Sequence, residues 1–118
     1  EGTSMDDLAR RIAPELPLSI LVLGMGADMH CASLFPGAPQ LDAALAPDAP
    51  PVMEVDAREG LEPRITLTGP VLRGALSTHV LITGPEKRRA LDKAARLSPR
   101  EAPIATILRD ATVHWAED

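Results

Sequence analysis

A histidine beside a short glycine loop is the first candidate for chemistry in this chain. Gly24 and Gly26 follow an apolar run, and Asp28 and His30 come directly after them. An imidazole titrates near neutral pH, so His30 could take a proton from water and later return it to a leaving oxygen. Asp28 is near enough to orient the ring, and the glycines allow a sharp turn whose N–H groups could face an oxyanion. From spacing alone, the simpler interpretation is that His30 makes a structural hydrogen bond and Asp28 caps a helix.

The other candidate residues indicate less chemistry. A dinucleotide-binding fingerprint would have its third glycine at position 29, which is Met29, so we expect no nicotinamide cofactor. Cys31 is interpreted as a small packed side chain rather than a reactive thiol. His79 and His114 fall in expected strands and are interpreted as structural rather than catalytic.

Composition and charge exclude several classes of function. The 118 residues fit one small domain or a large piece of one. A net charge of -5 argues against a nucleic-acid partner but permits a small anionic ligand. Because Cys31 is the only cysteine, we expect neither a disulfide framework nor a metal cluster held by thiols. This cysteine content is typical of a protein in the reducing cytoplasm. No apolar run approaches the ~20 residues that span a bilayer, so we expect no membrane partner. The first four residues lack a signal-peptide pattern, and the chain begins like one entered in its middle.

Apolar periodicity and proline positions predict an α/β layer architecture. Residues 18–23 are nearly all apolar, which is typical of a strand buried on both faces of a parallel sheet. The glycine loop follows this strand at once, at the edge where open α/β sheets place their ligands. Residues 37–51 are rich in proline and are expected to be irregular. The expected helices span residues 5–12 (capped by Thr3 or Ser4), 71–76, 85–96 and 104–108. The other expected strands span residues 52–55, 65–68, 79–83 and 113–115.

The loop sequence resembles an enzyme signature. Residues 24–37 are similar to the 6-phosphogluconolactonase signature, which runs Gly-x-Gly-x-Asp-Gly-His-Thr-Ala-Ser-Leu-Phe-Pro-Gly. The match holds at Gly24, Gly26, Asp28, His30, Ala32, Ser33, Leu34, Phe35, Pro36 and Gly37. Residues 63–68, 79–87 and 113–115 are similar to further stretches of the same family, so the resemblance covers about residues 15–118.

This resemblance implies a Rossmann-like three-layer α/β fold with a mainly parallel sheet, that of the lactonase/deaminase superfamily, present here incompletely. It implies hydrolysis of 6-phospho-D-glucono-1,5-lactone to 6-phospho-D-gluconate in the oxidative pentose phosphate pathway, with no metal or organic cofactor. By this analogy His30 is the general base that activates water, and Asp28 holds its ring. Backbone N–H groups at Gly24 and Gly26 would stabilise the oxyanion, and the protonated histidine would donate to the departing ring oxygen.

Two cations are candidates for binding the substrate phosphate. Arg64 begins an expected strand, and its planar fork suits phosphate oxygens. Lys87 lies in the first turn of an expected helix, where the helix dipole already favours an anion. The alternative for both residues is a solvent-exposed position with no binding role. The resemblance favours phosphate binding.

The resemblance also predicts an incomplete domain. The family's enzymes are about twice as long, so we expect residues 1–118 to form one domain, the carboxyl-terminal half of a 6-phosphogluconolactonase-like domain. Such a half would expose a sheet edge and apolar surface, which favours self-association or contact with the missing amino-terminal half. The family has Gly where this chain has Met29, and a positive φ there would cost methionine on the order of 1 kcal/mol.

Two alternative functions stay open. Glucosamine-6-phosphate deaminase (isomerising) shares the fold and the Asp-Gly-His motif. Its Phe-Asn-Glu-Pro stands where this chain has Ser-Leu-Phe-Pro at residues 33–36, so the glutamate partner of its histidine is missing here. The second alternative is a non-catalytic domain that binds sugar phosphates or a protein partner, motivated by Met29 and the missing half.

Overall fold

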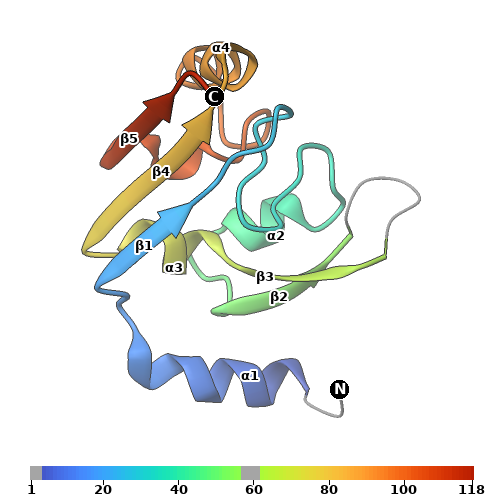
Figure 1. Ribbon diagram of the computed structural model, residues 1–118. Coiled ribbons are helices and arrows are strands. Elements are labelled where there is room, and N and C mark those ends of the chain that lie inside the picture. Colours follow the sequence, from blue (N-terminus) through green and yellow to red (C-terminus); the bar gives the residue numbers. More distant parts are fainter. Residues whose placement is uncertain (1–3, 57–61) are drawn as a thin grey trace.

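The computed structural model describes residues 4–56 and 62–118 and has an α/β architecture (Figure 1). In chain order its elements are α1 (Met5–Ile12), η1 (Ala13–Glu15), β1 (Ile20–Leu23), α2 (Leu41–Leu45), β2 (Val52–Val55), β3 (Arg64–Leu67), α3 (Gly69–Gly74), β4 (Ser77–Thr83), α4 (Pro85–Ala94), α5 (Ala105–Leu108) and β5 (Ala111–Ala116). The expected elements are therefore present, with ends shifted by a few residues. Two elements were not expected: η1, a single turn of 3-10 helix directly after α1, and α2, a short helix inside the segment that we expected to be irregular.

The first helix begins where the sequence predicts. The Ser4 hydroxyl accepts a hydrogen bond from the backbone N–H of Asp7 at 3.1 Å, so Ser4 is the cap. Thr3, the alternative cap, lies outside the described residues. Asp6 and Asp7 in the first turn, with Arg10 and Arg11 in the last, match the helix dipole.

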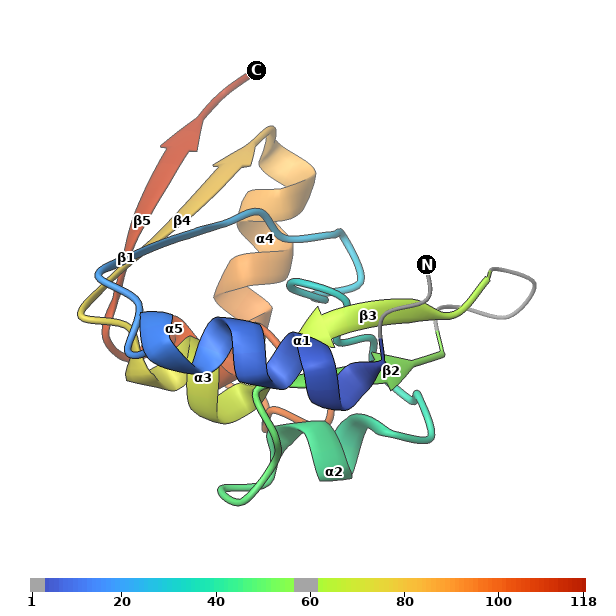
Figure 2. The same cartoon turned by 90° about the horizontal axis from the view of Figure 1, so that it is seen from below.

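Three parallel strands in the order β1-β4-β5 form the sheet that carries the candidate site. The parallel arrangement requires long crossovers, and the one between β4 and β5 contains both α4 and α5. Helices α4 and α5 cover one face of this sheet (Figures 1 and 2). Strand residues on that face join helix residues in one aliphatic core, which includes Leu21, Leu23, Val80, Ile82, Leu91, Ala94, Ile104 and Ile107.

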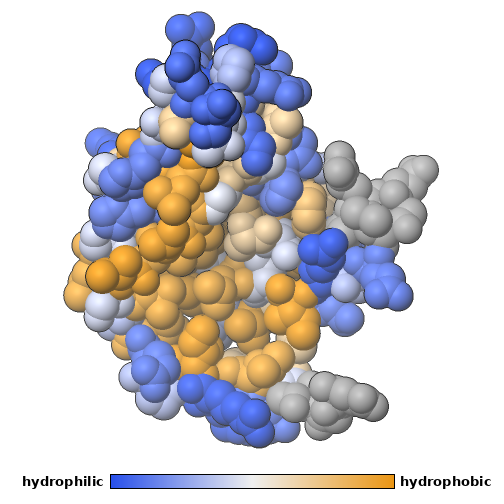
Figure 3. All heavy atoms as spheres, in the orientation of Figure 1, coloured by the Kyte–Doolittle hydropathy of each residue, from blue (hydrophilic) through white to orange (hydrophobic). Residues whose placement is uncertain are grey.

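The opposite face of the sheet is bare. Along β1 the burial alternates, and Ile20 and Val22 are 67% and 57% exposed; Leu81 on β4 is 51% exposed. Figure 3 shows apolar side chains gathered in a broad patch over this side of the molecule. The prediction that residues 18–23 are buried on both faces is therefore wrong for the described chain, because no described layer covers the second face. The expected exposure of apolar surface is confirmed.

A second, smaller sheet supports the site from the side. Strands β2 and β3 pair antiparallel, with Val52 opposite Leu67 and Val55 opposite Arg64. Helix α1 runs beneath this hairpin and contacts β2 (Figures 1 and 2). The main sheet is parallel as expected, and the antiparallel hairpin is a separate unit.

Within residues 4–56 and 62–118, no helix has the length and apolarity to cross a membrane.

Candidate active site

The turn after β1 positions the candidate base. Strand β1 ends at Leu23, and the chain then leaves the sheet through Gly24 into a turn closed by two backbone hydrogen bonds. The N–H of Gly26 donates to the carbonyl of His30 at 3.1 Å, and the N–H of Met29 donates to the carbonyl of Gly26 at 2.8 Å. His30 is therefore held by a compact turn beyond the carboxyl end of a parallel strand, where α/β folds bind ligands.

Asp28 and His30 form the closest polar contact of this turn. Oδ1 of Asp28 lies 2.5 Å from Nδ1 of His30, and the same oxygen accepts the backbone N–H of His30 at 3.1 Å. The two side chains are 29% and 30% exposed, so the pair is partly shielded but accessible. An ionised carboxylate only accepts hydrogen bonds, so its contact places the ring proton on Nδ1 and leaves the lone pair on Nε2. This arrangement suits a general base.

Two further residues fix the imidazole. The ring of Phe35 stacks on that of His30 with centroids 4.5 Å apart and an interplanar angle of 29°, and Phe35 itself is buried. A Cβ at position 26 would overlap the His30 ring and lie 2.7 Å from Oδ1 of Asp28. Position 26 must therefore be glycine, because the His30 ring lies too close to the backbone to leave room for a Cβ atom. Its own N–H is engaged inside the turn, which argues against the predicted role of Gly26 as an oxyanion donor in this conformation.

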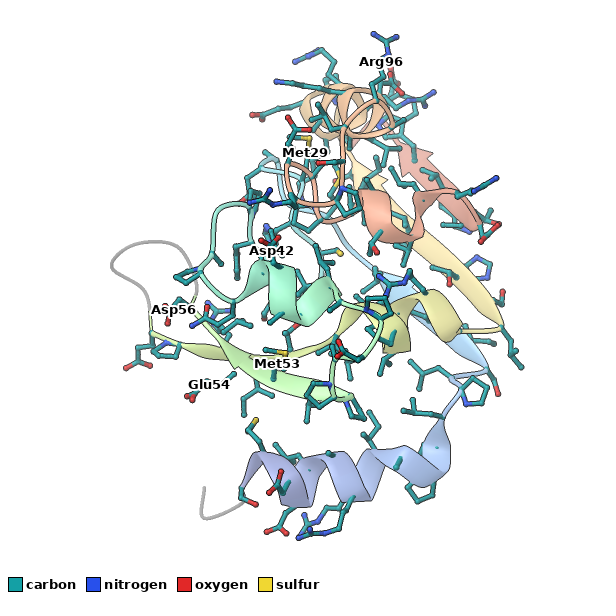
Figure 4. All side chains as sticks on the ribbon, turned by 180° about the vertical axis from the view of Figure 1, so that it is seen from behind. Met29, Asp42, Met53, Glu54, Asp56 and Arg96 are labelled. Atoms are coloured by element: carbon teal, nitrogen blue, oxygen red, sulfur yellow. The ribbon has the colours of Figure 1, made fainter. Side chains whose placement is uncertain are left out.

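Met29 has a positive φ, the backbone conformation in which methionine was expected to be less favourable than the glycine of the family signature. Its φ is 72°, in the left-handed region that favours glycine. Its side chain packs against the core, and its carbonyl accepts the N–H of Ile104 at 3.1 Å. Figure 4 shows Met29 in the loop beneath α4. The strained turn is therefore anchored to the segment that precedes α5.

Cys31, beside the candidate base, is buried as predicted. Burial raises the pKa of its thiol from the ordinary 9.0 to about 12, because desolvation disfavours the thiolate. A thiol held in its neutral form is a poor nucleophile. Cys31 is therefore a packing residue of the turn.

Thr66 links the turn to the β2–β3 hairpin, and sequence reasoning did not single it out. Its hydroxyl accepts the backbone N–H of Ser33 at 3.0 Å and donates to the carbonyl of Leu67 at 2.8 Å. Side chains alternate along a strand, so Arg64 shares the face of β3 that carries Thr66. The structure thus puts Arg64 on the hairpin face next to the turn, exposed at the start of β3.

A cleft of about 630 Å³ opens at the carboxyl ends of the parallel strands. Gly24 and Lys87 both line it, so the structure brings together a glycine of the signature loop and one candidate phosphate ligand. Lys87 is half-buried in the first turn of α4. The residues lining the cleft are Gly24, Met25, Leu81, Ile82, Thr83, Lys87, Val113, His114, Trp115 and Ala116. Neither His30 nor Arg64 lines it in the described chain.

No grouping of three or more His, Cys, Asp or Glu side chains suited to a metal ion occurs in residues 4–56 and 62–118.

Phe35 and Thr66 are the site residues that sequence reasoning missed. The sequence contained a signal for Phe35, since it lies within the matched signature. It gave none for Thr66, whose role depends on the packing of the hairpin.

The fold and this turn define an α/β protein with a histidine–aspartate pair at the end of a parallel strand, and comparisons identify its family. The sequence model of glucosamine-6-phosphate isomerases/6-phosphogluconolactonase matches residues 3–115. A 6-phosphogluconolactonase of Mesorhizobium japonicum is 39% identical over 121 residues, which cover 98% of this chain and 50% of the relative. One of Rhizobium meliloti is 40% identical over 106 residues, covering 85% and 46%.

Solved structures agree with the sequence comparisons. A 6-phosphogluconolactonase of Shewanella baltica superposes with a TM-score of 0.84 at 25% identity, covering 94% of this chain and 50% of that one. The enzyme of Thermotoga maritima gives 0.74 at 27% identity, covering 94% and 49%. The chain belongs to the glucosamine-6-phosphate isomerase/6-phosphogluconolactonase family, as the resemblance predicted. It spans about half the length of the curated relatives it matches.

Proposed function

We propose that this chain carries the catalytic base of a 6-phosphogluconolactonase. The reaction is hydrolysis of 6-phospho-D-glucono-1,5-lactone to 6-phospho-D-gluconate, in the cytoplasm and within the oxidative pentose phosphate pathway. The observation that carries the proposal is the contact of 2.5 Å between Asp28 and His30, inside a signature turn at the end of a parallel strand. The names of the relatives in the comparisons support the same activity.

In the proposed reaction, Nε2 of His30 takes a proton from a water molecule as that water attacks the lactone carbonyl. Asp28 holds the ring and stabilises the imidazolium that forms. The tetrahedral intermediate collapses when the imidazolium returns the proton to the ring oxygen, which opens the lactone. We assign the oxyanion to backbone N–H groups near Gly24 rather than to Gly26, whose N–H is already bonded to His30.

The phosphate of the substrate is assigned to Lys87 and Arg64. Lys87 lines the cleft at the start of a helix of ten residues, so its charge adds to the positive end of the helix dipole. Arg64 lies on the hairpin face that contacts the turn through Thr66 and Ser33, where its guanidinium could clamp phosphate oxygens. The two cations would approach the substrate from different sides.

We further propose that residues 1–118 are the carboxyl-terminal half of the enzyme's domain, and that the bare sheet face is covered by the other half. The exposed residues Ile20, Val22 and Leu81 form the centre of this face. Without that cover, the same face should cause self-association, since large apolar patches seldom stay exposed. Light scattering at rising concentration tests this, with Val22→Lys as the variant expected to dissociate; a wild-type chain that stays monomeric at high concentration contradicts it.

The activity is tested by following lactone loss and ammonia release in parallel. The chain is combined with the part of the Mesorhizobium japonicum relative that it does not match. Lactone hydrolysis above the spontaneous rate supports the proposal, whereas release of ammonia from glucosamine 6-phosphate favours a deaminase. A folded combination that binds 6-phosphogluconate and hydrolyses nothing would indicate a non-catalytic domain.

A further inference from the structure

Trp115, the only tryptophan of the chain, lies beside the start of helix α4. It is the register partner of Ile82, which is buried in the core beneath the helices, so its ring lies on the helix-covered face of the sheet and not on the bare face. The guanidinium of Arg88 on α4 stands over this ring, 5.4 Å from the centroid. Strands β4 and β5 end side by side next to α4 (Figure 1). The indole is therefore part of the contact between β5 and α4.

Strand β5 holds both backbone groups of Gly84, the residue that joins β4 to α4. The N–H of Gly84 donates to the carbonyl of Ala116 at 2.9 Å, and Nε1 of Trp115 donates to the carbonyl of Gly84 at 2.9 Å. The same carbonyl accepts the N–H of Arg88 at 3.2 Å, which is the first hydrogen bond of the helix. Two adjacent residues of one strand thus fix the point at which α4 begins.

Gly84 needs this support because it precedes the helix without a capping side chain. Helices usually begin after Ser, Thr, Asp or Asn, whose side chain binds an N–H of the first turn. Gly84 has a φ of 88°, in the left-handed region, and an unrestrained glycine has wide conformational freedom. The direction in which α4 leaves the sheet therefore depends on the hydrogen bonds from β5.

Lys87 depends on the same turn. It lies three residues after Gly84, in the first turn of α4, and it lines the cleft that Trp115 also lines. A lysine has a flexible stem, so its ammonium is positioned only as well as the backbone that carries it. Rotation of the chain at Gly84 would move the whole first turn of the helix, and the ammonium of Lys87 with it.

We propose that Trp115 is a positioning residue for phosphate binding: its indole N–H holds the carbonyl of Gly84, and the fixed turn directs Lys87 into the cleft. This inference rests on the proposed function, since it takes Lys87 as the ligand of the substrate phosphate. The ring itself is held from the helix side. Arg88 packs over it by a cation–π contact and pairs with Asp92, with 3.5 Å between Nε and Oδ1.

The test compares Trp115→Phe with wild type, each combined with the part of the Mesorhizobium japonicum relative that this chain does not match. Phenylalanine keeps an aromatic ring beneath Arg88 and lacks the N–H. We expect the KM for the lactone and the Kd for inorganic phosphate, measured by calorimetry, to rise together by roughly threefold to tenfold, as for the loss of one hydrogen bond. The kcat should stay within about twofold of wild type. Replacement of Trp115 by 3-benzothienylalanine, which has the shape of tryptophan without its N–H, should give the same result.

A double-mutant cycle separates positioning of Lys87 from a general loosening of the fold. In the Lys87→Ala chain, Trp115→Phe should change the Kd for phosphate by less than about twofold, because the group that Trp115 positions is gone. In the Lys93→Ala chain, which keeps Lys87, Trp115→Phe should have its full effect. Ile107→Val, which removes a methyl group from the core, should lower stability and leave the Kd for phosphate unchanged.

Folding of every variant is checked by circular dichroism, and the 3-benzothienylalanine chain serves if Trp115→Phe unfolds. The inference is overturned if loss of the indole N–H leaves phosphate binding unchanged, if its effect persists in full without Lys87, or if it lowers kcat at constant KM. It is also overturned if the folded wild-type combination binds no phosphate. Phosphate binding that depends on Trp115 and Lys87, without any lactone hydrolysis, would contradict the proposed function and leave this inference in place.

Discussion

Oδ1 of Asp28 lies 2.5 Å from Nδ1 of His30 and also accepts the backbone N–H of His30 at 3.1 Å. One carboxylate oxygen of Asp28 therefore contacts both the ring and the backbone N–H of His30, within a turn only a few residues long. Phe35 stacks against the ring, so rotation of the imidazole is restricted on two sides. The proposed chemistry depends on this restriction, because the ring must present Nε2 with its lone pair toward water.

Replacing Asp28 by asparagine should remove the preference for the proton on Nδ1 while keeping the shape of the turn. We expect the kcat for lactone hydrolysis to fall roughly 100-fold to 10,000-fold, with KM little changed. Asp92→Asn, on the exposed side of α4 where Asp92 pairs with Arg88, is the control. Equal rates in the two variants would show that Asp28 does not position the base.

Replacing Met29 should reveal the cost of its positive φ of 72°. Met29→Ala and Met29→Gly both remove the side chain that packs against the core, but only glycine adopts this φ without strain. Met29→Gly should therefore unfold at higher urea than Met29→Ala, by about 1 kcal/mol in the free energy of unfolding. Its lactonase rate should equal or exceed that of wild type. A less stable glycine variant would mean that the turn does not impose this conformation.

Burial of Cys31 predicts a loss of stability at high pH. The pKa of the thiol is about 12 in the folded chain and near its ordinary 9.0 when unfolded, so between these values the unfolded state releases a proton that the folded state keeps. The stabilisation is complete below pH 9 and is lost as pH rises toward 12, by about 1.4 kcal/mol for each pH unit. Urea unfolding at several pH values measures the slope. Cys31→Ala should lack this contribution, and an identical slope in both chains would contradict the assignment.

Lys87 is predicted to bind the substrate phosphate. Loss of a charged hydrogen bond should weaken binding, so Lys87→Ala should raise KM roughly 10-fold to 100-fold. Lys93→Ala tests the same change of charge on the same helix, at an exposed position outside the cleft. Competition by inorganic phosphate distinguishes the two variants without relying on turnover. A similar effect of both substitutions would indicate a general effect of charge rather than a contact.

Much of the fold was predictable because its elements carry local signals. Ser4 caps α1, and Pro85 begins α4 in the position where proline is favoured. The helix α2 could not be predicted, since it has only five residues and lies among prolines. The exposure of Ile20 and Val22 could not be predicted either, because burial depends on which layers cover a strand and not on the strand's own sequence.

The candidate site was predictable in part. Spacing placed Asp28 beside His30, and the signature placed both in a turn after a strand. The contact of Ser33 with Thr66 joins residues 33 positions apart, and no local pattern encodes it. The stacking of Phe35 depends on the turn in between, where Ala32 has a φ of 51°. The occupied N–H of Gly26 likewise emerged only from the closed turn.

The most direct test of the central claim is lactone hydrolysis by wild type, His30→Ala and Lys93→Ala, each combined with the part of the Mesorhizobium japonicum relative that this chain does not match. The spontaneous rate is subtracted, and folding is checked by circular dichroism. The account predicts hydrolysis by wild type and Lys93→Ala, and none above background by His30→Ala. Hydrolysis that persists in folded His30→Ala, or that is absent from the folded wild-type combination, would contradict it.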